Sequence, residues 1–131
     1  MRNIVNKRLE RILRRPDYLR AARTKNNAVT PGLILQSAPL GVNATGLGPR
    51  IGYTVSKKVG NAVARNRARR RLKSIASDVF EAESKEPLDF VLIGRVNTLK
   101  RSYDDLLDDL RFALKQIRSR QSVDKLRKKN E

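Results

Sequence analysis

The stretch from Lys57 to Lys73, KKVGNAVARNRARRRLK, constrains the fold more than any other part of the chain. It holds eight basic residues in seventeen and no acid. Small and apolar residues nevertheless recur through it and beyond it at the three- and four-residue spacing of one helix face. Asn61 is a favourable N-cap. The pattern predicts a helix over 61–80 that packs an apolar face on a sheet, formed by Ala64, Ala68, Leu72, Ile75 and Val79.

The polar residues of this predicted helix gather on its other side. On a helical wheel Asn66, Arg69, Arg70 and Lys73 lie opposite the apolar face, and Arg65, Arg67 and Arg71 flank them. Close like charges repel each other by a few tenths of a kcal/mol per pair, and no acid precedes Asp78 to offset this. RNA or DNA phosphates would relieve the repulsion and release bound counterions.

The residues around the start of the helix favour the same kind of partner. Backbone N–H groups near Gly60 and Asn61 would point at an anion, and Lys57 and Lys58 flank them. Arginine suits bidentate phosphate contacts and stacking on unpaired bases. These features predict a nucleic-acid-binding helix, with structured RNA favoured weakly over DNA.

The charge of the whole chain is distributed unevenly. The 131 residues carry a formal net charge of +17, and residues 1–73 contain 18 basic residues but only two acids, Glu10 and Asp17. The second part, 74–131, holds 12 basic residues and 11 acids. A solvated face usually mixes both signs, so a basic half of this kind favours a polyanionic partner.

Other features exclude several classes of protein. The chain has no cysteine and no histidine, which excludes disulfides, thiolate or imidazole metal sites and a histidine base. No apolar run approaches the roughly 20 residues of a membrane span, and the first residues lack the apolar core of a secretory signal. We therefore expect a cytoplasmic protein of one domain over 1–131, with no membrane partner and no obligate protein partner.

The N-terminal part of the chain alternates between loops and short elements. Residues 1–15 are expected to be flexible, or a frayed helix that orders on a partner. Pro16 fits the first turn of a helix. The pattern then predicts a helix to about Arg23, a loop over 25–30, a strand over 31–36, a loop with a possible extra strand over 39–49, and a strand over 50–56. The strands 31–36 and 50–56 are expected to be antiparallel neighbours.

The C-terminal part predicts a central strand and a long helix. DFVLIGR, residues 89–95, is a continuous apolar run of strand length, separated from the preceding helix by AESKEP. Ser102 can cap a last helix with the apolar face Leu106, Leu107, Leu110, Leu114 and Ile117. Residues 119–131 are expected to be frayed or a weak helical extension. The predicted class is α+β, a two-layer sandwich of one sheet against helices.

The ordered stretch Arg50–Lys73, RIGYTVSKKVGNAVARNRARRRLK, with RNR at residues 65–67, resembles the signature of the bacterial ribonuclease P protein subunit. The resemblance implies the αβββαβα order over about 11–117, with a mixed sheet and a left-handed crossover at the basic helix, against the usual right-handed rule.

The resemblance also implies a function. A large catalytic RNA would hydrolyse the phosphodiester that joins the 5′ leader to precursor tRNA, using Mg²⁺ bound mainly by RNA, so no catalytic residue and no metal ligand is expected in the protein. Its partners would be the RNase P RNA and precursor tRNA. The residues expected to face the catalytic RNA are Lys57, Lys58, Asn61, Arg65, Asn66, Arg67, Arg69, Arg70 and Lys73.

A second surface implied by the resemblance is a cleft between the first helix and the sheet, which would hold the single-stranded leader. Its residues here are Tyr18, Ala22, Ile34 and Gln36. Ala22 and Gln36 stand where some members have aromatic residues, so leader binding would depend less on base stacking and more on backbone charge. Tyr18 could instead be a core residue that covers the sheet. Lys25 stands where the family often has glycine.

Three alternatives compete with this interpretation. A ribosomal or other structural RNA-binding protein would share the charge and the small α+β domain. A self-sufficient nuclease would need clustered carboxylates or a histidine near the basic face. The arginines could also pair with the acids that follow Ser102, although first-turn aspartates are common partners of a helix dipole and need form no metal site; these acids are Asp104, Asp105, Asp108 and Asp109.

Overall fold

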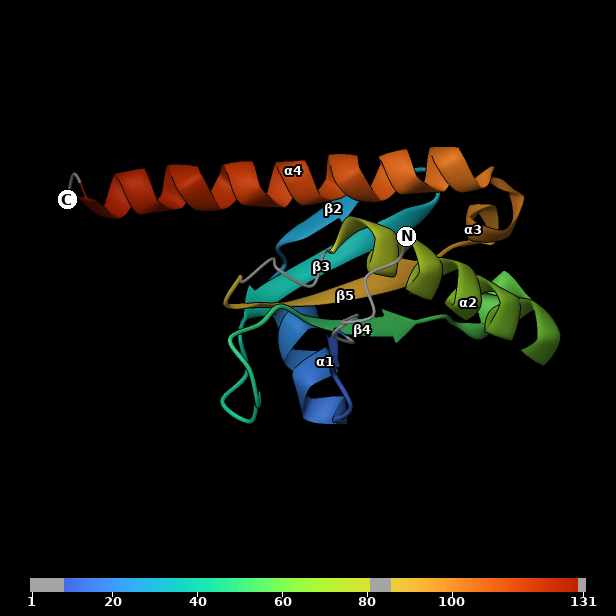
Figure 1. The fold of residues 1–131 in the computed structure, drawn as a ribbon, viewed down its shortest axis with the longest axis horizontal. Helices are drawn as coiled ribbons and strands as arrows, with labels where there is room; N and C mark the ends of the chain where they lie inside the picture. Colours follow the sequence, from blue (N-terminus) through green and yellow to red (C-terminus); the bar gives the residue numbers. More distant parts are fainter. Residues whose placement is uncertain (1–8, 81–85, 130–131) are drawn as a thin grey trace, which may run out of the picture.

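A mixed five-stranded sheet is the centre of the structure, a computed structural model that describes residues 9–80 and 86–129, without the side chains of 121–129. Its strands, in the order β1-β4-β5-β3-β2, pair in parallel at β1–β4 and β4–β5 and antiparallel elsewhere (Figure 1). The strands are β1 (Glu10–Arg11), β2 (Asn27–Val29), β3 (Leu33–Pro39), β4 (Arg50–Thr54) and β5 (Leu88–Gly94).

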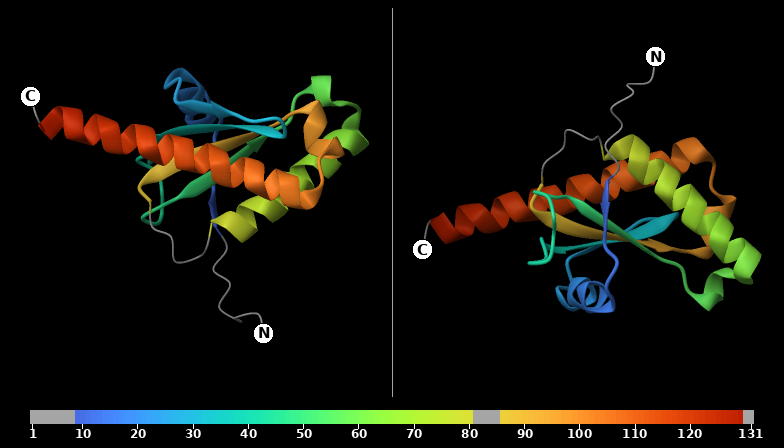
Figure 2. Two further views of the ribbon diagram at one scale, coloured as in Figure 1. Left: turned by 90° about the horizontal axis from the view of Figure 1, so that it is seen from above. Right: turned by 60° about the horizontal axis from the view of Figure 1, so that its bottom comes forward.

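Helices cover both faces of this sheet. They are α1 (Arg15–Arg23), the 3₁₀ turn η1 (Lys57–Val59), α2 (Ala62–Val79), α3 (Val96–Lys100) and α4 (Tyr103–Lys129). α2 and α4 pack on one face and share the larger apolar core, whereas α1 lies alone on the opposite face (Figure 2). The predicted α+β class is confirmed, with helices on two faces of the sheet rather than one.

β5 is the central strand, as its unbroken apolar run predicts. Phe90 and Leu92 point into the core with α2 and α4, while Val91 and Ile93 point to the α1 side. Both faces of β5 are covered except at the half-buried Ile93, which is why the strand reads as an apolar run without alternation.

The two long helices follow their sequence patterns closely. The Asn61 side chain accepts a hydrogen bond from the Ala64 N–H at 2.9 Å, and Ser102 Oγ accepts one from Asp105 N–H at 3.1 Å. Pro16 lies in the first turn of α1, as predicted. The predicted apolar face of α2 is confirmed by full burial of Ala68, Leu72 and Ile75. In α4 it is confirmed by the buried residues Leu106, Leu110, Leu114 and Ile117.

Three predictions about the sheet are wrong. β3 and β4 run in opposite directions but are not neighbours, because β5 pairs with both. The extra strand does not lie within 40–49; it is β2, in the stretch predicted to be a loop. β1 was not predicted, although Ile12, which follows it, is buried. β1 and β2 are two and three residues long, too short to show an alternating pattern.

The connection from β4 through α2 to β5 has the rarer hand. In Figure 1 both strands run to the right, β5 lies above β4, and α2 lies on the viewer's side of the sheet, as the views of Figure 2 show. This is a left-handed crossover, against the right-handed rule for parallel strands. The predicted break after α2 falls largely on residues 81–85, which lie outside the described residues, as do residues 1–8.

Candidate RNA-binding surfaces

The first candidate surface, here called the arginine face, comprises two lysines of η1, the cap residue of α2, and six basic or amide residues of α2. Most are exposed, and Arg65 and Arg69 are half-buried. α2 packs its apolar side on the sheet, so this face points away from the core. The structure therefore brings together all the residues that the sequence predicted for contact with a catalytic RNA: Lys57, Lys58, Asn61, Arg65, Asn66, Arg67, Arg69, Arg70 and Lys73.

These cations are not neutralised within the part of the chain that the structure describes. No ion pair there joins the arginine face to a carboxylate. The acids of α4 pair elsewhere: Asp109 accepts two hydrogen bonds from Arg101 at 2.8 and 3.0 Å, and Asp108 lies 3.6 Å from Arg111. The alternative in which those acids neutralise the α2 arginines is therefore not what the structure shows.

The start of α2 adds partial positive charge to this face. Asn61 caps the helix through Ala64 N–H, while the N–H groups of Ala62 and Val63 have no intrahelical acceptor. Lys57 and Lys58 are exposed immediately before the helix. An anion at this end would meet backbone donors and two ammonium groups together.

Tyr53 lies between the arginine face and the sheet edge. Lys73 Nζ is 5.9 Å and Arg11 Cζ 6.0 Å from the centre of its ring, which are cation–π distances. Burial raises the pKa of Tyr53 to about 12, although Arg11 opposes the shift. The phenol is therefore neutral at physiological pH, and its ring orients two cations.

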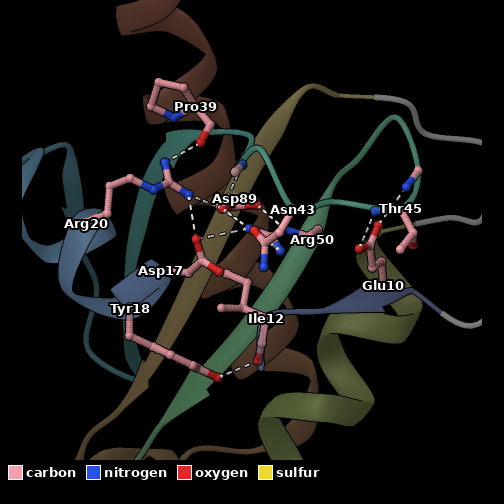
Figure 3. Close-up of polar contacts among 12 residues, drawn as sticks. Glu10, Ile12, Asp17, Tyr18, Arg20, Pro39, Asn43, Thr45, Arg50 and Asp89 are labelled. Atoms are coloured by element: carbon pink, nitrogen blue, oxygen red, sulfur yellow. Dashed lines mark hydrogen bonds and ion pairs between the residues drawn. The ribbon is translucent and has the colours of Figure 1, made fainter. Parts of the chain in front are cut away.

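A buried ion cluster holds α1 on the sheet (Figure 3). The Arg50 guanidinium donates to both carboxylate oxygens of Asp89, at 2.8 and 2.7 Å, and lies 3.4 Å from Asp17. Arg20 on α1 donates to the same Asp89, whose side chain is fully buried. The hydrogen bond to Asp89 raises the pKa of Arg50 further above its already high usual value. Sequence analysis missed this cluster.

Tyr18 serves as a structural residue on this side of the sheet. Its hydroxyl donates to the Ile12 carbonyl at 3.1 Å and accepts from Tyr53 N–H at 3.3 Å. Its ring lies over Gly52, where an added Cβ would come within 2.8 Å of the ring. These contacts support the interpretation that Tyr18 covers the sheet, although the residue is only half-buried.

The second candidate surface, here called the leader strip, is the part of the sheet beside α1. Ile34 and Gln36 of β3 point to the α1 face and are half-buried, and Ala22 is exposed on the same side of α1 as Tyr18. The structure thus brings the four predicted cleft residues to one side of the sheet. Strand register adds three residues that sequence analysis did not include: Val29 and Ile93 pair with Ile34 on either side, and Thr54 pairs with Ile93 one strand further on. Period-two alternation along β4 and β5 was the available signal for Thr54 and Ile93.

Lys25 connects α1 to β2 in a left-handed backbone conformation, with φ 55°. This conformation is routine for glycine and costs other residues about 1–2 kcal/mol. The turn that the family often builds with glycine is therefore formed here with an exposed lysine.

Other kinds of site find no support within the described residues. No three acidic residues there come close enough together to hold a metal ion. No helix there is both long and apolar enough to cross a membrane.

A small α+β fold defines an RNA-binding protein when one side carries a cationic helix, here without an ion pair to any described carboxylate, and the other a half-exposed strip of sheet. The family model for ribonuclease P matches residues 7–118. The chain belongs to the ribonuclease P protein family.

Individual relatives agree with this assignment. The ribonuclease P protein component of Paramagnetospirillum magneticum is 50% identical over 111 residues, covering 84% of each chain. That of Ruegeria pomeroyi is 44% identical over 79% of this chain and 82% of its own. Among solved structures, the RNase P protein of Staphylococcus aureus matches with a TM-score of 0.65 at 22% identity, over 82% of this chain and 94% of its own. The RNase P protein of Thermotoga maritima matches with a TM-score of 0.61 at 21% identity, over 77% of this chain and 91% of its own. These two structures support the fold.

Proposed function

We propose that this protein assists a catalytic RNA in removing the 5′ leader of precursor tRNA by phosphodiester hydrolysis, and that it does so in the cytoplasm. The observation that carries the proposal is the arginine face, a set of cations with no carboxylate partner among the described residues, on a helix whose other side is fixed to the core. Phosphates of a folded RNA supply the missing partners. Membership of the ribonuclease P family supports the choice of RNA.

The chemistry itself belongs to the RNA in this proposal. Residues 57–73 offer ammonium, guanidinium and amide groups but no carboxylate and no histidine. Such groups bind and orient phosphates, but they do not supply a general base near neutral pH. Mg²⁺ is held mainly by the RNA, and the protein favours it indirectly by fixing the phosphates around it.

The leader strip binds the substrate in this proposal. Ile34, Ile93 and Val29 offer apolar surface to bases, Gln36 offers an amide, and Ala22 leaves space beside α1. The strip has no ring besides that of Tyr18, which is engaged with the backbone of Ile12 and Tyr53. Leader binding therefore depends on backbone charge and shape more than on stacking.

The test is cleavage of a precursor tRNA at low millimolar Mg²⁺ by a bacterial RNase P RNA known to respond to a protein subunit. Three reactions are compared: RNA with this protein, RNA alone, and protein alone. Cleavage at the 5′ end of the mature tRNA that requires RNA and protein together supports the proposal. No gain on adding the protein would contradict it, and cleavage by the protein alone would move the chemistry into the chain.

A further inference from the structure

A pocket of about 320 Å³ lies along one flank of α4, away from both surfaces described above. It is open to solvent and is lined by residues three and four positions apart, so they form one stripe of the helix. These residues are Phe112, Lys115, Gln116, Ser119 and Arg120. Nothing in the proposed function uses them.

This pocket runs beside β2, the edge strand of the sheet. At one end of the stripe, Asp109 and Leu106 lie against Gly32, in the turn that follows β2. At the other end, Arg120 donates to the carbonyl of Asn27, the first residue of β2. The two contacts fix the flank along the full strand, and Figure 1 shows α4 running along β2.

The chemistry of the pocket suits a nucleotide. Phe112 is 55% exposed, which is unusual for a phenylalanine and leaves the ring available for stacking. Lys115 and Arg120 are exposed cations beside it, and Gln116 and Ser119 add hydrogen-bonding groups. Two acids at this end of the helix are each engaged with an arginine: Asp108 lies 3.6 Å from Arg111, and Asp109 accepts two hydrogen bonds from Arg101. A base against the ring with its phosphate on a cation would use all these features.

The leader strip leads to this pocket. Thr54 at the end of β4 lies three residues before the first residue of η1, where Lys57 and Lys58 start the arginine face. From Thr54 the strip crosses β5 and β3 and ends at Val29 on β2, which is 60% exposed. An RNA strand that starts at the arginine face and follows the strip therefore leaves the sheet at the edge along which the pocket runs.

We propose that the pocket on α4 binds a nucleotide of the single-stranded leader, at a position farther from the cleavage site than the nucleotides on the strip. The base stacks on Phe112 and its phosphate pairs with Lys115. This inference rests on the proposed function, because it takes the strip as the path of the leader. The second site extends the length of leader that the protein reads.

The test uses the reconstituted RNA–protein enzyme and a series of precursor tRNAs whose leaders are shortened one nucleotide at a time. Substrate affinity is measured for wild type, Phe112→Leu, Phe112→Tyr and Lys115→Gln. Tyr103→Leu is the matched control, because Tyr103 is also a partly exposed aromatic residue of α4 but bonds to Asp78 outside the pocket. Phe112→Leu should weaken binding of long leaders about fivefold, the low end for loss of one stacked base.

The pattern across leader lengths decides the proposal. The defect of Phe112→Leu should vanish once the leader is too short to leave the strip, and Phe112→Tyr should restore wild-type affinity. Three results would overturn the proposal that the pocket binds a leader nucleotide. They are an equal loss of affinity at every leader length, no loss of affinity with long leaders, and an equal loss of affinity in Tyr103→Leu. Weaker binding of the RNA subunit in the absence of substrate would also overturn it, by making the catalytic RNA the occupant.

Failure of this inference can be told apart from failure of the proposed function. Suppose that the wild-type protein stimulates leader cleavage, but the loss of substrate affinity in the variants does not depend on leader length. Then only the proposal that the pocket binds a leader nucleotide is wrong. If wild-type protein gives no stimulation, the proposed function fails first.

Discussion

The buried ion cluster and the arginine face use the same side chain in opposite ways. Arg50 is 2% exposed and shares Asp89 with Arg20, so its charge is neutralised by the fold. Arg67 and Arg70 are exposed and have no carboxylate partner among the described residues. The first set fixes α1 on the sheet, and the second is left for a partner outside the chain.

This contrast shows how to assign an arginine when a sequence contains many. Charge alone does not separate structural from binding arginines, because both sets belong to the same basic half of the chain. An acid within reach does separate them. Arg50 finds Asp89 directly opposite in the strand register, whereas Arg67 and Arg70 lie on the exposed side of α2.

Replacing Asp89 is expected to have the largest effect. Asp89→Asn keeps the shape but removes the carboxylate that binds the buried Arg50 through two hydrogen bonds, leaving only Asp17, at 3.4 Å, as a charged partner. Breaking a buried ion pair from one side typically costs about 3–5 kcal/mol of unfolding free energy. Urea denaturation followed by circular dichroism measures this loss.

Arg111→Ala is the matched control for Asp89→Asn, because it removes an exposed ion pair with Asp108. It should cost about 0–1 kcal/mol. If the two variants lost similar stability, the ion cluster would not be the structural part of the comparison.

Removing two cations from the arginine face should have the opposite effect to Asp89→Asn: stability is kept and RNA affinity is lost. In the double variant Arg67→Ala/Arg70→Ala, stability should stay within about 0.5 kcal/mol of wild type, since neither side chain touches the core and repulsion along α2 is relieved. Affinity for the RNA subunit should fall at least about tenfold, because two charge-assisted hydrogen bonds to phosphate are removed. Filter binding across a salt series measures the affinity.

The salt dependence of that variant gives a second check. The slope of log affinity against log salt should become shallower by about 1.8, at 0.9 per phosphate contact, if the relation for duplex DNA holds for this RNA. An unchanged slope, or a clear loss of melting temperature, would contradict the assignment of these arginines to RNA.

Sequence reasoning predicted the arginine face better than the ion cluster, for a physical reason. The positions of α2 residues around the helix follow from a local repeat, so the exposed and buried sides could be assigned from spacing alone. The pairing of Arg50 with Asp89 depends on β4 and β5 being parallel neighbours, which 39 residues of separation do not reveal. The incorrect pairing predicted for β3 and β4 has the same cause: the order of strands is a property of the whole sheet, and local sequence patterns do not report it.

The leader strip was predicted in part. Resemblance to the family gave Tyr18, Ala22, Ile34 and Gln36, and strand register then added Thr54, Ile93 and Val29. β2 could not be predicted from three residues, so Val29 and the edge beside α4 were missed as well. Whether these residues contact a leader stays a prediction.

Tyr53 lies at the boundary between the two regions and should show a pH effect of intermediate size. Its pKa is raised to about 12 in the folded protein, from an ordinary value of 10.0. The folded state therefore holds the phenol proton more tightly than the unfolded state does. The resulting stabilisation is complete below pH 10 and is lost as pH rises through 12.

Comparison with Tyr53→Phe isolates this contribution. Relative to the variant, wild type should lose about 1–2 kcal/mol of unfolding free energy between pH 9 and pH 12, after allowance for partial exposure. Tyr103, whose pKa is also raised to about 12, is common to both proteins and cancels. A difference that stays constant over this range would show that Tyr53 is not buried enough to resist ionisation.

Lys25 should give the smallest change in stability and the clearest separation of stability from binding. Lys25→Gly relieves the left-handed backbone but adds freedom to the unfolded chain, so the net gain should be about 0.5–1 kcal/mol. Affinity for single-stranded RNA should fall, because an exposed cation between α1 and β2 is lost. Thermal melts and fluorescence anisotropy measure the two quantities.

Lys25→Asn is the control for the backbone, since asparagine tolerates this conformation and has no charge. Like the glycine variant, it should bind RNA more weakly than wild type. If either neutral variant retained full affinity for single-stranded RNA, the Lys25 side chain would have no part in RNA binding, and its strained backbone would simply be tolerated.

The position of β5 in the sheet also sets an order of events during synthesis. The pairs β1–β4 and β2–β3 are joined only through β5, within the part of the chain that the structure describes. Until Gly94 has left the ribosome, β3 and β4 have no strand between them, and α2 has no completed sheet to pack on. The basic half of the protein is thus made first but cannot complete its sheet until β5 follows, which gives a nascent chain rich in arginine a period of exposure to the ribosomal RNA around it.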